Sequence, residues 1–266
     1  MTRIGVVGHV EWVEFVSVAA LPRGGQVARG RESFTRAAGG GAVAAVVLAE
    51  LGAEVDFFCA LGRDPNGLAA AAQLEQRGVR VHVAWREHQT RRALGLLVDG
   101  GERAVVTIGE RMQPRGDDDL PWSSLEFADG VYFTAGDANA LARSRAARNV
   151  VATPRAREAF RGSGPSVDAL VFSAGDHDES AWAKELSERT RYLVATDGAS
   201  GGQWRGENAG SWQAVAPEGP IRDDFGAGDS FAAGFTLGLA QGRSIAAAAD
   251  LGASAGAHAL TRAGAP

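Results

Sequence analysis

The sequence is poor in cysteine and lysine: it contains one of each, Cys59 and Lys184. A lone cysteine excludes an intrachain disulfide and a cysteine-rich metal site, and its place in the apolar run VDFFCAL indicates a buried thiol. No apolar run reaches the roughly 20 residues that span a bilayer, and the N-terminus MTRIGVVGHVEW lacks a signal-peptide pattern. We therefore expect a cytoplasmic protein that has no membrane partner.

The single lysine also limits how the chain can handle phosphate. Lys184 follows no glycine-rich loop, so the Gly-x-x-x-x-Gly-Lys-Ser/Thr phosphate loop is absent, and it does not lie in the Val-Ala-Ile-Lys strand of a protein kinase. The formal net charge is −5, which leaves no basic footprint for nucleic acid. A phosphate would have to be bound by backbone amides, arginines or a metal ion.

Short apolar runs alternate with helix-like segments along most of the 266 residues. The runs predict buried strands at residues 3–8, 54–61, 79–85, 130–135, 149–153, 167–173 and 191–198. Helices are expected at residues 41–51, 65–78, 137–148, 154–162, 178–189, 226–239 and 244–260, with an antiparallel pair at 203–216. This order predicts one α/β domain over residues 1–266, a doubly wound, mostly parallel sheet with helices on both faces.

Two segments depart from this alternation. Residues 10–36 alternate apolar and polar side chains around a break at Pro22–Gly25. Residues 89–111 hold two strand-like runs joined by Asp99-Gly100-Gly101, a strong hairpin signal. We expect these strands to form a small β-sheet beside the body, whose exposed edges would favour a dimer.

The stretch IRDDFGAGDSFAAGF, residues 221–235, places glycines where a helix begins. Unpaired N–H groups and the helix dipole make such a position suitable for an anion, and glycine lets a phosphate approach the backbone closely. Asp229 would repel an anion but could accept a proton from a hydroxyl that attacks a phosphate, while the amides of Ala227, Gly228 and Asp229 hold the developing charge. A helix cap with glycines for close packing explains the residue types equally well.

Five motifs in chain order set these readings in a wider pattern: AGGGAVAAVVLAELGAEV, FCALGRDPNG, VATDGASGG, DDFGAGDSFAAGF and ALTRAGA. Together they resemble the ribokinase-like (PfkB) sugar kinases over nearly the whole chain. The resemblance implies a doubly wound α/β fold, a lid that covers the sugar and often mediates dimers, and transfer of the γ-phosphate of ATP to a sugar or nucleoside hydroxyl with Mg²⁺.

The resemblance also implies roles for individual residues. Asp229 matches the catalytic base, and Gly226, Ala227 and Gly228 match the anion hole. Thr196, Gly198 and Gly201 match the ATP-side element, and the acids before the anion hole, Asp223 among them, match the region of a K⁺ site found in many members. The sugar would be bound by Glu11, His9, Gly39, Gly40, Gly41 and the position of Val43.

Departures from the family pattern concentrate at the substrate end. Val43 replaces an asparagine that bonds sugar hydroxyls, and Glu11 replaces an aspartate. The family's Asn-x-x-Glu element is matched to Ser173-Ala174-Gly175-Asp176, in which Asp176 could hold a water on Mg²⁺. We therefore expect a small sugar or sugar-like acceptor that is not bound as ribose is in ribokinase.

Arginines of the lid segments, Arg36, Arg92 and Arg111, could add recognition of an anionic group if one faces the pocket, which would favour a phosphorylated or acidic sugar. Two other functions compete. The run from Gly39 to Ala44 fits a dinucleotide-binding Gly-x-Gly-x-x-Ala, but the polar RESFTRAA precedes it where a buried strand is needed. A catalytically weak sugar or nucleotide sensor of the same fold is supported by Val43 and opposed by Asp229.

Overall fold

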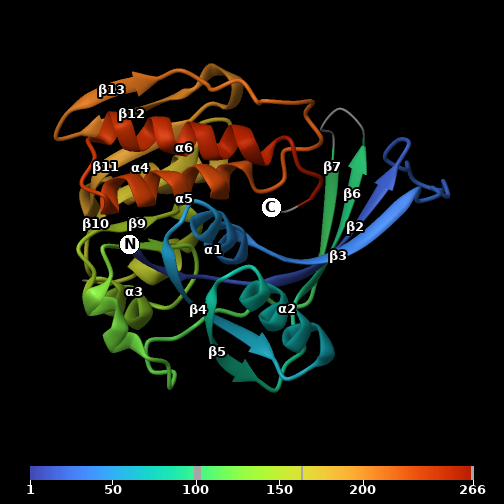
Figure 1. Cartoon of the computed structure of the whole chain (residues 1–266), viewed down its shortest axis with the longest axis horizontal. Coiled ribbons are helices and arrows are strands. Elements are labelled where there is room, and N and C mark those ends of the chain that lie inside the picture. Colours follow the sequence, from blue (N-terminus) through green and yellow to red (C-terminus); the bar gives the residue numbers. More distant parts are fainter. Residues whose placement is uncertain (99–102, 163, 265–266) are drawn as a thin grey trace.

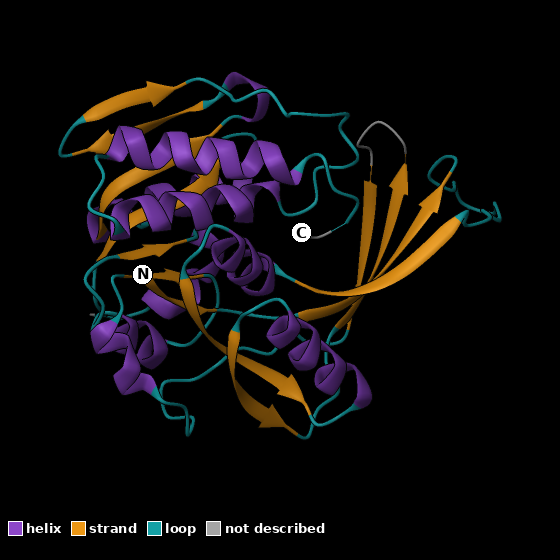
Figure 2. Ribbon diagram, viewed as in Figure 1, coloured by secondary structure: helices purple, strands orange, loops and turns teal. Residues whose placement is uncertain are grey.

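The computed structural model describes residues 1–98, 103–162 and 164–264. Its body is a nine-stranded sheet in the order β13-β12-β11-β10-β9-β8-β1-β4-β5 (Figures 1 and 2). The seven strands from β11 to β5 pair in parallel, and β12 and β13 add an antiparallel edge. The strands are β1 (Arg3–Val7), β4 (Glu54–Gly62), β5 (Arg80–Arg86), β8 (Gly130–Phe133), β9 (Val150–Ala152), β10 (Val167–Ser173), β11 (Thr190–Thr196), β12 (Gly202–Gly206) and β13 (Ala209–Trp212).

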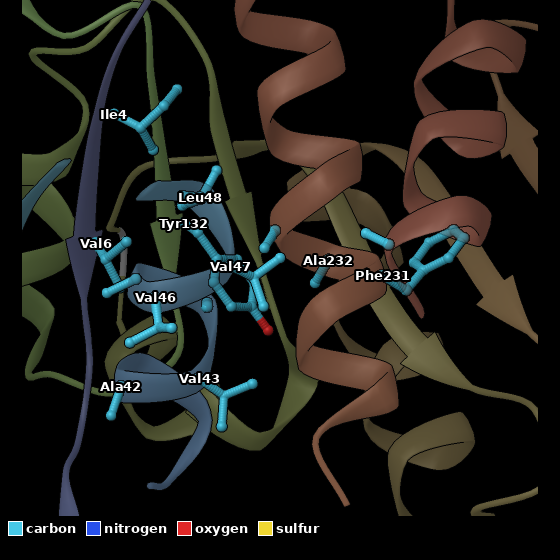
Figure 3. Packing of buried hydrophobic residues seen from close by; sticks show 14 of the residues in the cluster. Ile4, Val6, Ala42, Val43, Val46, Val47, Leu48, Tyr132, Phe231 and Ala232 are labelled. Carbon is cyan, nitrogen blue, oxygen red and sulfur yellow. The ribbon is translucent and has the colours of Figure 1, made fainter. Parts of the chain in front are cut away.

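Helices cover both faces of this sheet, and each face has its own core. One core joins Ile4 and Val6 of β1 to small and branched residues of α1 (Gly40–Glu50) and α5 (Ala227–Ala240), as Figure 3 shows. The other contains Val7 of the same strand. The helical elements are α1, α2 (Pro65–Gln76), η1 (Trp122–Phe127), α3 (Ala138–Ser144), η2 (Pro154–Phe160), α4 (His177–Glu185), η3 (Ser187–Arg189), η4 (Gly198–Ser200), α5 and α6 (Ile245–Ala259).

Glycines allow α5 to lie close to α6. A Cβ on Gly234 would lie 2.8 Å from the Leu251 carbonyl oxygen, and one on Gly238 would lie 2.7 Å from Cα of Ala248. Such contacts admit no side chain, so glycine is required despite its low helix propensity. This packing fixes α5, and with it the position of the residues at its N-terminus.

A separate four-stranded sheet stands beside the body in the order β3-β2-β6-β7 (Figure 1). It consists of β2 (Glu11–Val18), β3 (Glu32–Ala38), β6 (Arg92–Val98) and β7 (Arg103–Ile108), and is called the lid below. β2 runs parallel to β6, and the other two pairings are antiparallel. The predicted Asp99-Gly100-Gly101 turn lies outside the described residues.

The predicted fold class, a mostly parallel α/β sheet plus a small β-sheet, is confirmed. One helix was predicted with the wrong type: residues 154–160 form a 3₁₀ segment with a non-helical Ala156, because Ala156 and Ala159 are both buried at the three-residue spacing of that helix. The 3₁₀ turn Trp122–Phe127 was not predicted. No helix among the described residues combines the length and apolar character needed to cross a membrane.

The strand order reverses at β1. From this strand the chain continues toward β4 and β5 on one side, and returns to β8 on the other. Ligands of open α/β sheets bind at the carboxyl ends of the strands beside such a reversal. His9 follows β1 and Thr134 follows β8, so both lie at the expected site.

Candidate active site

A cavity of about 440 Å³ opens where the carboxyl ends of the strands, the N-terminus of α5 and the lid meet. It is lined by His9, Gly39, Gly40, Arg103, Arg111, Tyr132, Thr134, Thr153, Arg155, Val171, Phe172, Ser173, Glu179, Thr196, Asp224, Phe225, Gly226, Gly228, Asp229 and Ala232. The predicted residues His9, Gly39, Gly40, Thr196, Gly226, Gly228 and Asp229 are therefore brought together.

The N-terminus of α5 presents free amides to this cavity. Gly226 caps the helix with φ of 75°, a left-handed conformation that favours glycine. The Ala227 N–H donates to the Asp224 carbonyl at 3.3 Å, whereas no acceptor among the described residues takes the N–H groups of Gly228 and Asp229. A Cβ on Gly228 would meet no atom within 4 Å, so a ligand has room to approach these two amides.

Asp229 is the half-buried carboxylate beside these amides. No described residue donates a hydrogen bond to its side chain, and burial, reinforced by the charge of Glu179, raises its pKa to about 6. Arg155 and Arg103 act in the opposite direction. A Cβ on Gly40 would lie 2.8 Å from Asp229 Oδ1, so the glycine leaves space next to the carboxylate.

His9 lies on the other side of that space. The Gly40 N–H donates to its Nε2 at 3.4 Å, which places the ring proton on Nδ1, 3.4 Å from Thr134 Oγ1. Burial and the charges of Arg111, Arg91 and Arg155 lower the pKa of His9 to about 3, so the imidazole is neutral. Gly39, with φ of 89°, allows the His9 ring to lie close to the backbone, because a Cβ added at this position would be 3.0 Å from that ring.

Arg155 and Glu179 complete the site, and neither was predicted. The Arg155 guanidinium donates two hydrogen bonds. Its Nε–H donates to Glu179 Oε1, and its Nη2–H donates to Asp176 Oδ2 at 2.6 Å. Glu179 also accepts the Ser173 N–H at 2.8 Å. Asp176 caps α4 by accepting the Glu179 N–H at 3.0 Å. The spacing Asp176-x-x-Glu179 could have revealed Glu179, because it repeats the family's four-residue element three residues further along the chain.

These carboxylates also determine how Mg²⁺ fits. Among the described residues no three His, Cys, Asp or Glu side chains form a metal cluster. Mg²⁺ in phosphoryl-transfer sites keeps several waters and uses few protein carboxylates, with substrate phosphates as further ligands. Glu179 in the cavity and the half-buried Asp176 suit such a water-mediated role. They do not form an all-protein cage.

The lid contacts the loop before α5. Arg103 of β7 pairs with Asp224 at 2.7 Å, and its guanidinium lies over the Phe225 ring at 5.3 Å. Phe15 of β2 packs edge-on against the same ring, with 5.0 Å between centroids. Asp223 faces the opposite way, 1% exposed, and accepts the N–H groups of Phe225 at 2.7 Å and Gly264 at 2.6 Å. A K⁺ site in this region stays a prediction.

The ATP-side element follows β11. Thr196 ends that strand, lines the cavity and donates from Oγ1 to the Phe172 carbonyl at 3.2 Å. Gly198 and Gly201 flank the short η4 turn with φ of 50° and 84°. A Cβ on Gly201 would lie 2.2 Å from the Trp212 carbonyl oxygen. Gly201 therefore packs the loop onto β13, and the cavity wall here is formed by Thr196.

Three predicted substrate residues lie away from the cavity wall. Val43 is 1% exposed and packs in the main core on α1 (Figure 3). Glu11 begins β2, and its Oε1 lies 3.3 Å from Nε of Arg91, the residue just before β6. This ion pair connects the starts of the two parallel lid strands. Gly41 packs against Phe57, whose ring would be 2.9 Å from a Cβ at that position. As sugar contacts, these three stay predictions.

Comparison with known proteins identifies this architecture. The model of the family described as pfkB family carbohydrate kinase matches residues 1–160 and 165–266. The chain belongs to the pfkB family of carbohydrate kinases. The predicted membership is thus confirmed, and so is the prediction of an ATP-dependent carbohydrate kinase.

Individual relatives cover most of this pfkB-family chain. The ATP-dependent ribose-1-phosphate kinase of Halopiger xanaduensis is 30% identical over 250 residues, which cover 88% of this chain and 84% of the relative. The ribokinase of Bacillus subtilis is 28% identical over 271 residues, 93% of this chain and 89% of that one. An acarbose 7(IV)-phosphotransferase of Actinoplanes is 47% identical, but over 76 residues, 27% of this chain and 25% of its own.

Solved structures agree on the fold. Arabidopsis thaliana ribokinase, complexed with ribose and ATP, superposes with a TM-score of 0.76 at 20% identity over 100% of this chain and 95% of the other. A microbiome-derived acarbose kinase gives a TM-score of 0.79 at 21% identity over 99% and 94%. At these identities the likeness establishes the ribokinase-like fold.

Proposed function

We propose that the protein transfers the γ-phosphate of ATP to a hydroxyl of a small sugar or sugar-like acceptor, with Asp229 as general base. The observation that carries this proposal is the half-buried Asp229 carboxylate, with a pKa raised to about 6, beside the unpaired amides of Gly228 and Asp229. The Asp229 carboxylate repels the phosphate charge that the N-terminus of α5 attracts. Their pairing is useful where a hydroxyl loses its proton while a phosphoryl group gains charge.

The roles follow from the geometry. The acceptor hydroxyl occupies the space between Asp229, Gly40 and His9. Its oxygen bonds to the γ-phosphorus, its proton passes to Asp229, and the bond from that phosphorus to the bridging oxygen breaks to release ADP. The free amides at the α5 N-terminus hold the equatorial oxygens. Mg²⁺, when bound with the nucleotide, neutralises phosphate charge and would be held through water by Glu179 and Asp176.

Thr196, Gly198 and Gly201 are proposed to face the nucleotide, because Thr196 lines the central cavity and the two glycines belong to the turn that follows it. His9 is proposed to contact the sugar through its ring edge. Since its pKa is about 3, the neutral His9 imidazole is a much weaker base than the Asp229 carboxylate, whose pKa is about 6. Asp229 is therefore left as the base of this site.

The kinase proposal is tested by ADP release from magnesium-ATP. The names of the relatives cite ribose 1-phosphate, ribose and acarbose, so the panel should span pentoses, hexoses, sugar phosphates, sugar acids, oligosaccharides and nucleosides. We expect turnover on one acceptor class well above the ATP hydrolysis seen without acceptor. If ATP binds but every acceptor fails, the protein acts as the sensor considered above.

The raised pKa of Asp229 predicts a pH dependence. A general base must be ionised, and a pKa of about 6 means that the carboxyl is protonated below that pH. We expect kcat/KM to be flat above about pH 7 and to fall about tenfold per pH unit below about pH 6, because kcat/KM reports groups of the free enzyme. Measurement from pH 4.5 to 8.5 tests this. An acid limb with the same midpoint in Asp229→Asn would assign it to another group.

We further propose a homodimer formed through the lid. The register places Val16, Leu94, Leu96, Val106 and Ile108 on the face opposite to that of Phe15, Gly95 and Val105, since directly paired residues share a face. Val106 is 56% exposed and Ile108 is 45% exposed, so this outer face presents exposed apolar side chains on β7, beside the exposed Glu14 and Arg92 that the register places on the same face. A second copy of the chain that presents the same face would cover it.

The dimer is tested by Val106→Glu. A charge at the centre of a covered apolar face should convert the dimer to monomers at micromolar concentration, measured by sedimentation velocity. Val27→Glu is the matched control, because Val27 is 94% exposed on the loop between β2 and β3. A wild-type protein that sediments as a monomer at all concentrations would contradict the proposal.

A further inference from the structure

Arg111 lies where two cavities meet. Together with Arg155 it lines both the central cavity and a second cavity of about 530 Å³. The second cavity is lined by the segment that follows β7, from Gly109 to Gln113, with His88, and by the carboxylate-bearing Glu110 and Glu158. An acceptor whose hydroxyl reaches Asp229 therefore has these two guanidinium groups at its other end.

Three neighbouring arginines are already neutralised by carboxylates, whereas Arg115, which also lines the second cavity, has no such ion pair among the described residues. Arg91 lies 3.3 Å from Glu11. Arg155 is held by Asp176 and Glu179. In the second cavity Arg86 forms two hydrogen bonds with Asp118, at 2.8 and 2.7 Å. These cations have little charge left for a ligand.

Arg111 differs from them. No carboxylate among the described residues lies within ion-pair distance of its guanidinium. Partial desolvation in the cleft and then the charge of Arg91 lower the pKa of this solvent-exposed arginine, while Glu11, which is paired with Arg91, opposes the shift. Arg155 and Arg157 add further repulsion. A cation held among cations is unfavourable unless an anion joins them.

We propose that the acceptor carries an anionic group, a phosphate ester or a carboxylate, that binds Arg111 at the end remote from the phosphorylated hydroxyl. The planar guanidinium suits two oxygens of either group. This inference rests on the proposed function, because it assigns the acceptor of the same site. It also identifies Arg111 as the specificity-determining residue among the three lid-segment arginines. Arg92 is not part of the cavity wall, and Arg36 lines a surface hollow with Arg77 and Arg262.

The test compares neutral sugars with their anionic counterparts. ADP release is measured for ribose with ribose 1-phosphate and ribose 5-phosphate, fructose with fructose 6-phosphate, and glucose with gluconate, which separates phosphate from carboxylate. We expect an anionic acceptor to be preferred. Arg111→Gln should raise the KM for that acceptor roughly 10- to 100-fold, the range for loss of a charged hydrogen-bond partner, and change kcat little.

Two variants sharpen the test. Arg111→Lys keeps the positive charge but lacks the planar guanidinium that can bind two oxygens at once. It should therefore recover part of the acceptor affinity that is lost in Arg111→Gln. Arg92→Gln removes an exposed arginine of the same lid sheet and should leave KM unchanged. Equal efficiency on the neutral and anionic members of every pair would overturn the proposal. So would an Arg111→Gln variant that lowers both members equally.

Failure of the kinase proposal gives a different result. If the wild-type protein turns over no acceptor, the same sugars are titrated calorimetrically in the presence of magnesium and a non-hydrolysable ATP analogue. Binding of an anionic sugar that weakens at least tenfold in Arg111→Gln would support the anion site without catalysis. Absence of binding by every anionic sugar would overturn it.

Discussion

Asp229→Asn is expected to lower kcat by about 10²- to 10⁴-fold, the usual contribution of a positioned general base. The amide has nearly the same shape but cannot take a proton. ATP affinity should be kept or slightly increased, because a negative charge beside the phosphate site is removed. The melting temperature should stay the same or rise, since the wild-type chain buries a carboxylate without hydrogen-bond donors among the described residues.

Asp224→Asn is the matched control for this variant. Asp224 belongs to the same loop and lines the same cavity, but its side chain is 57% exposed and pairs with Arg103 at 2.7 Å. Exposed pairs contribute little, so we expect less than a tenfold loss of kcat. ADP release and nucleotide titration decide the matter. A kcat of Asp229→Asn within threefold of the wild-type kcat would show that Asp229 is not the general base. If neither the wild type nor the variant turns over and both bind ligand equally well, the result favours a sensor.

Much of the fold could be predicted because its signals are local. Apolar runs bounded by turns mark strands that are buried on both faces, and glycine marks where helices end. The lid was recognisable because two segments broke the strand–helix order. The 3₁₀ segment after Thr153 was mistaken for an α-helix, because seven residues of mixed composition carry no periodicity that separates the two.

The α5 half of the site could also be predicted from one stretch, because Gly226, Gly228 and Asp229 are adjacent in sequence. The rest depends on strand ends that meet only in the folded sheet. Thr134, Arg155 and Glu179 follow three different strands, and no local pattern joins them. Their convergence is a consequence of strand order.

Two positions show why a motif does not fix a side chain's surroundings. Val43 occupies the place of a polar family residue, yet on α1 its side chain lies in the core, 1% exposed. Glu11 replaces an acid expected to bind sugar, and here its charge is engaged by Arg91 in the lid. The polar side chains that do line the central cavity include His9, Arg111 and Arg155.

Gly40→Ala is expected to reduce kcat/KM by at least about 100-fold through one methyl group. A Cβ at this position would lie 2.8 Å from Asp229 Oδ1 and 3.4 Å from Thr134 Oγ1, in the space assigned to the acceptor hydroxyl. Real contacts of this kind require a shift, and a displacement of about 1 Å between base and acceptor can cost 10²-fold. Steady-state kinetics with the best acceptor measure the effect.

The loss should be confined to steps that involve the acceptor. Nucleotide affinity should be unchanged, because the atoms nearest to a Cβ on Gly40 belong to the side chains of Asp229 and Thr134 and none is a backbone amide of α5. Gly24→Ala is the control: no atom lies within 4 Å of a Cβ there, so activity and stability should match the wild type. A Gly40→Ala enzyme with wild-type kcat/KM would show that the acceptor hydroxyl approaches Asp229 from a different direction, away from His9.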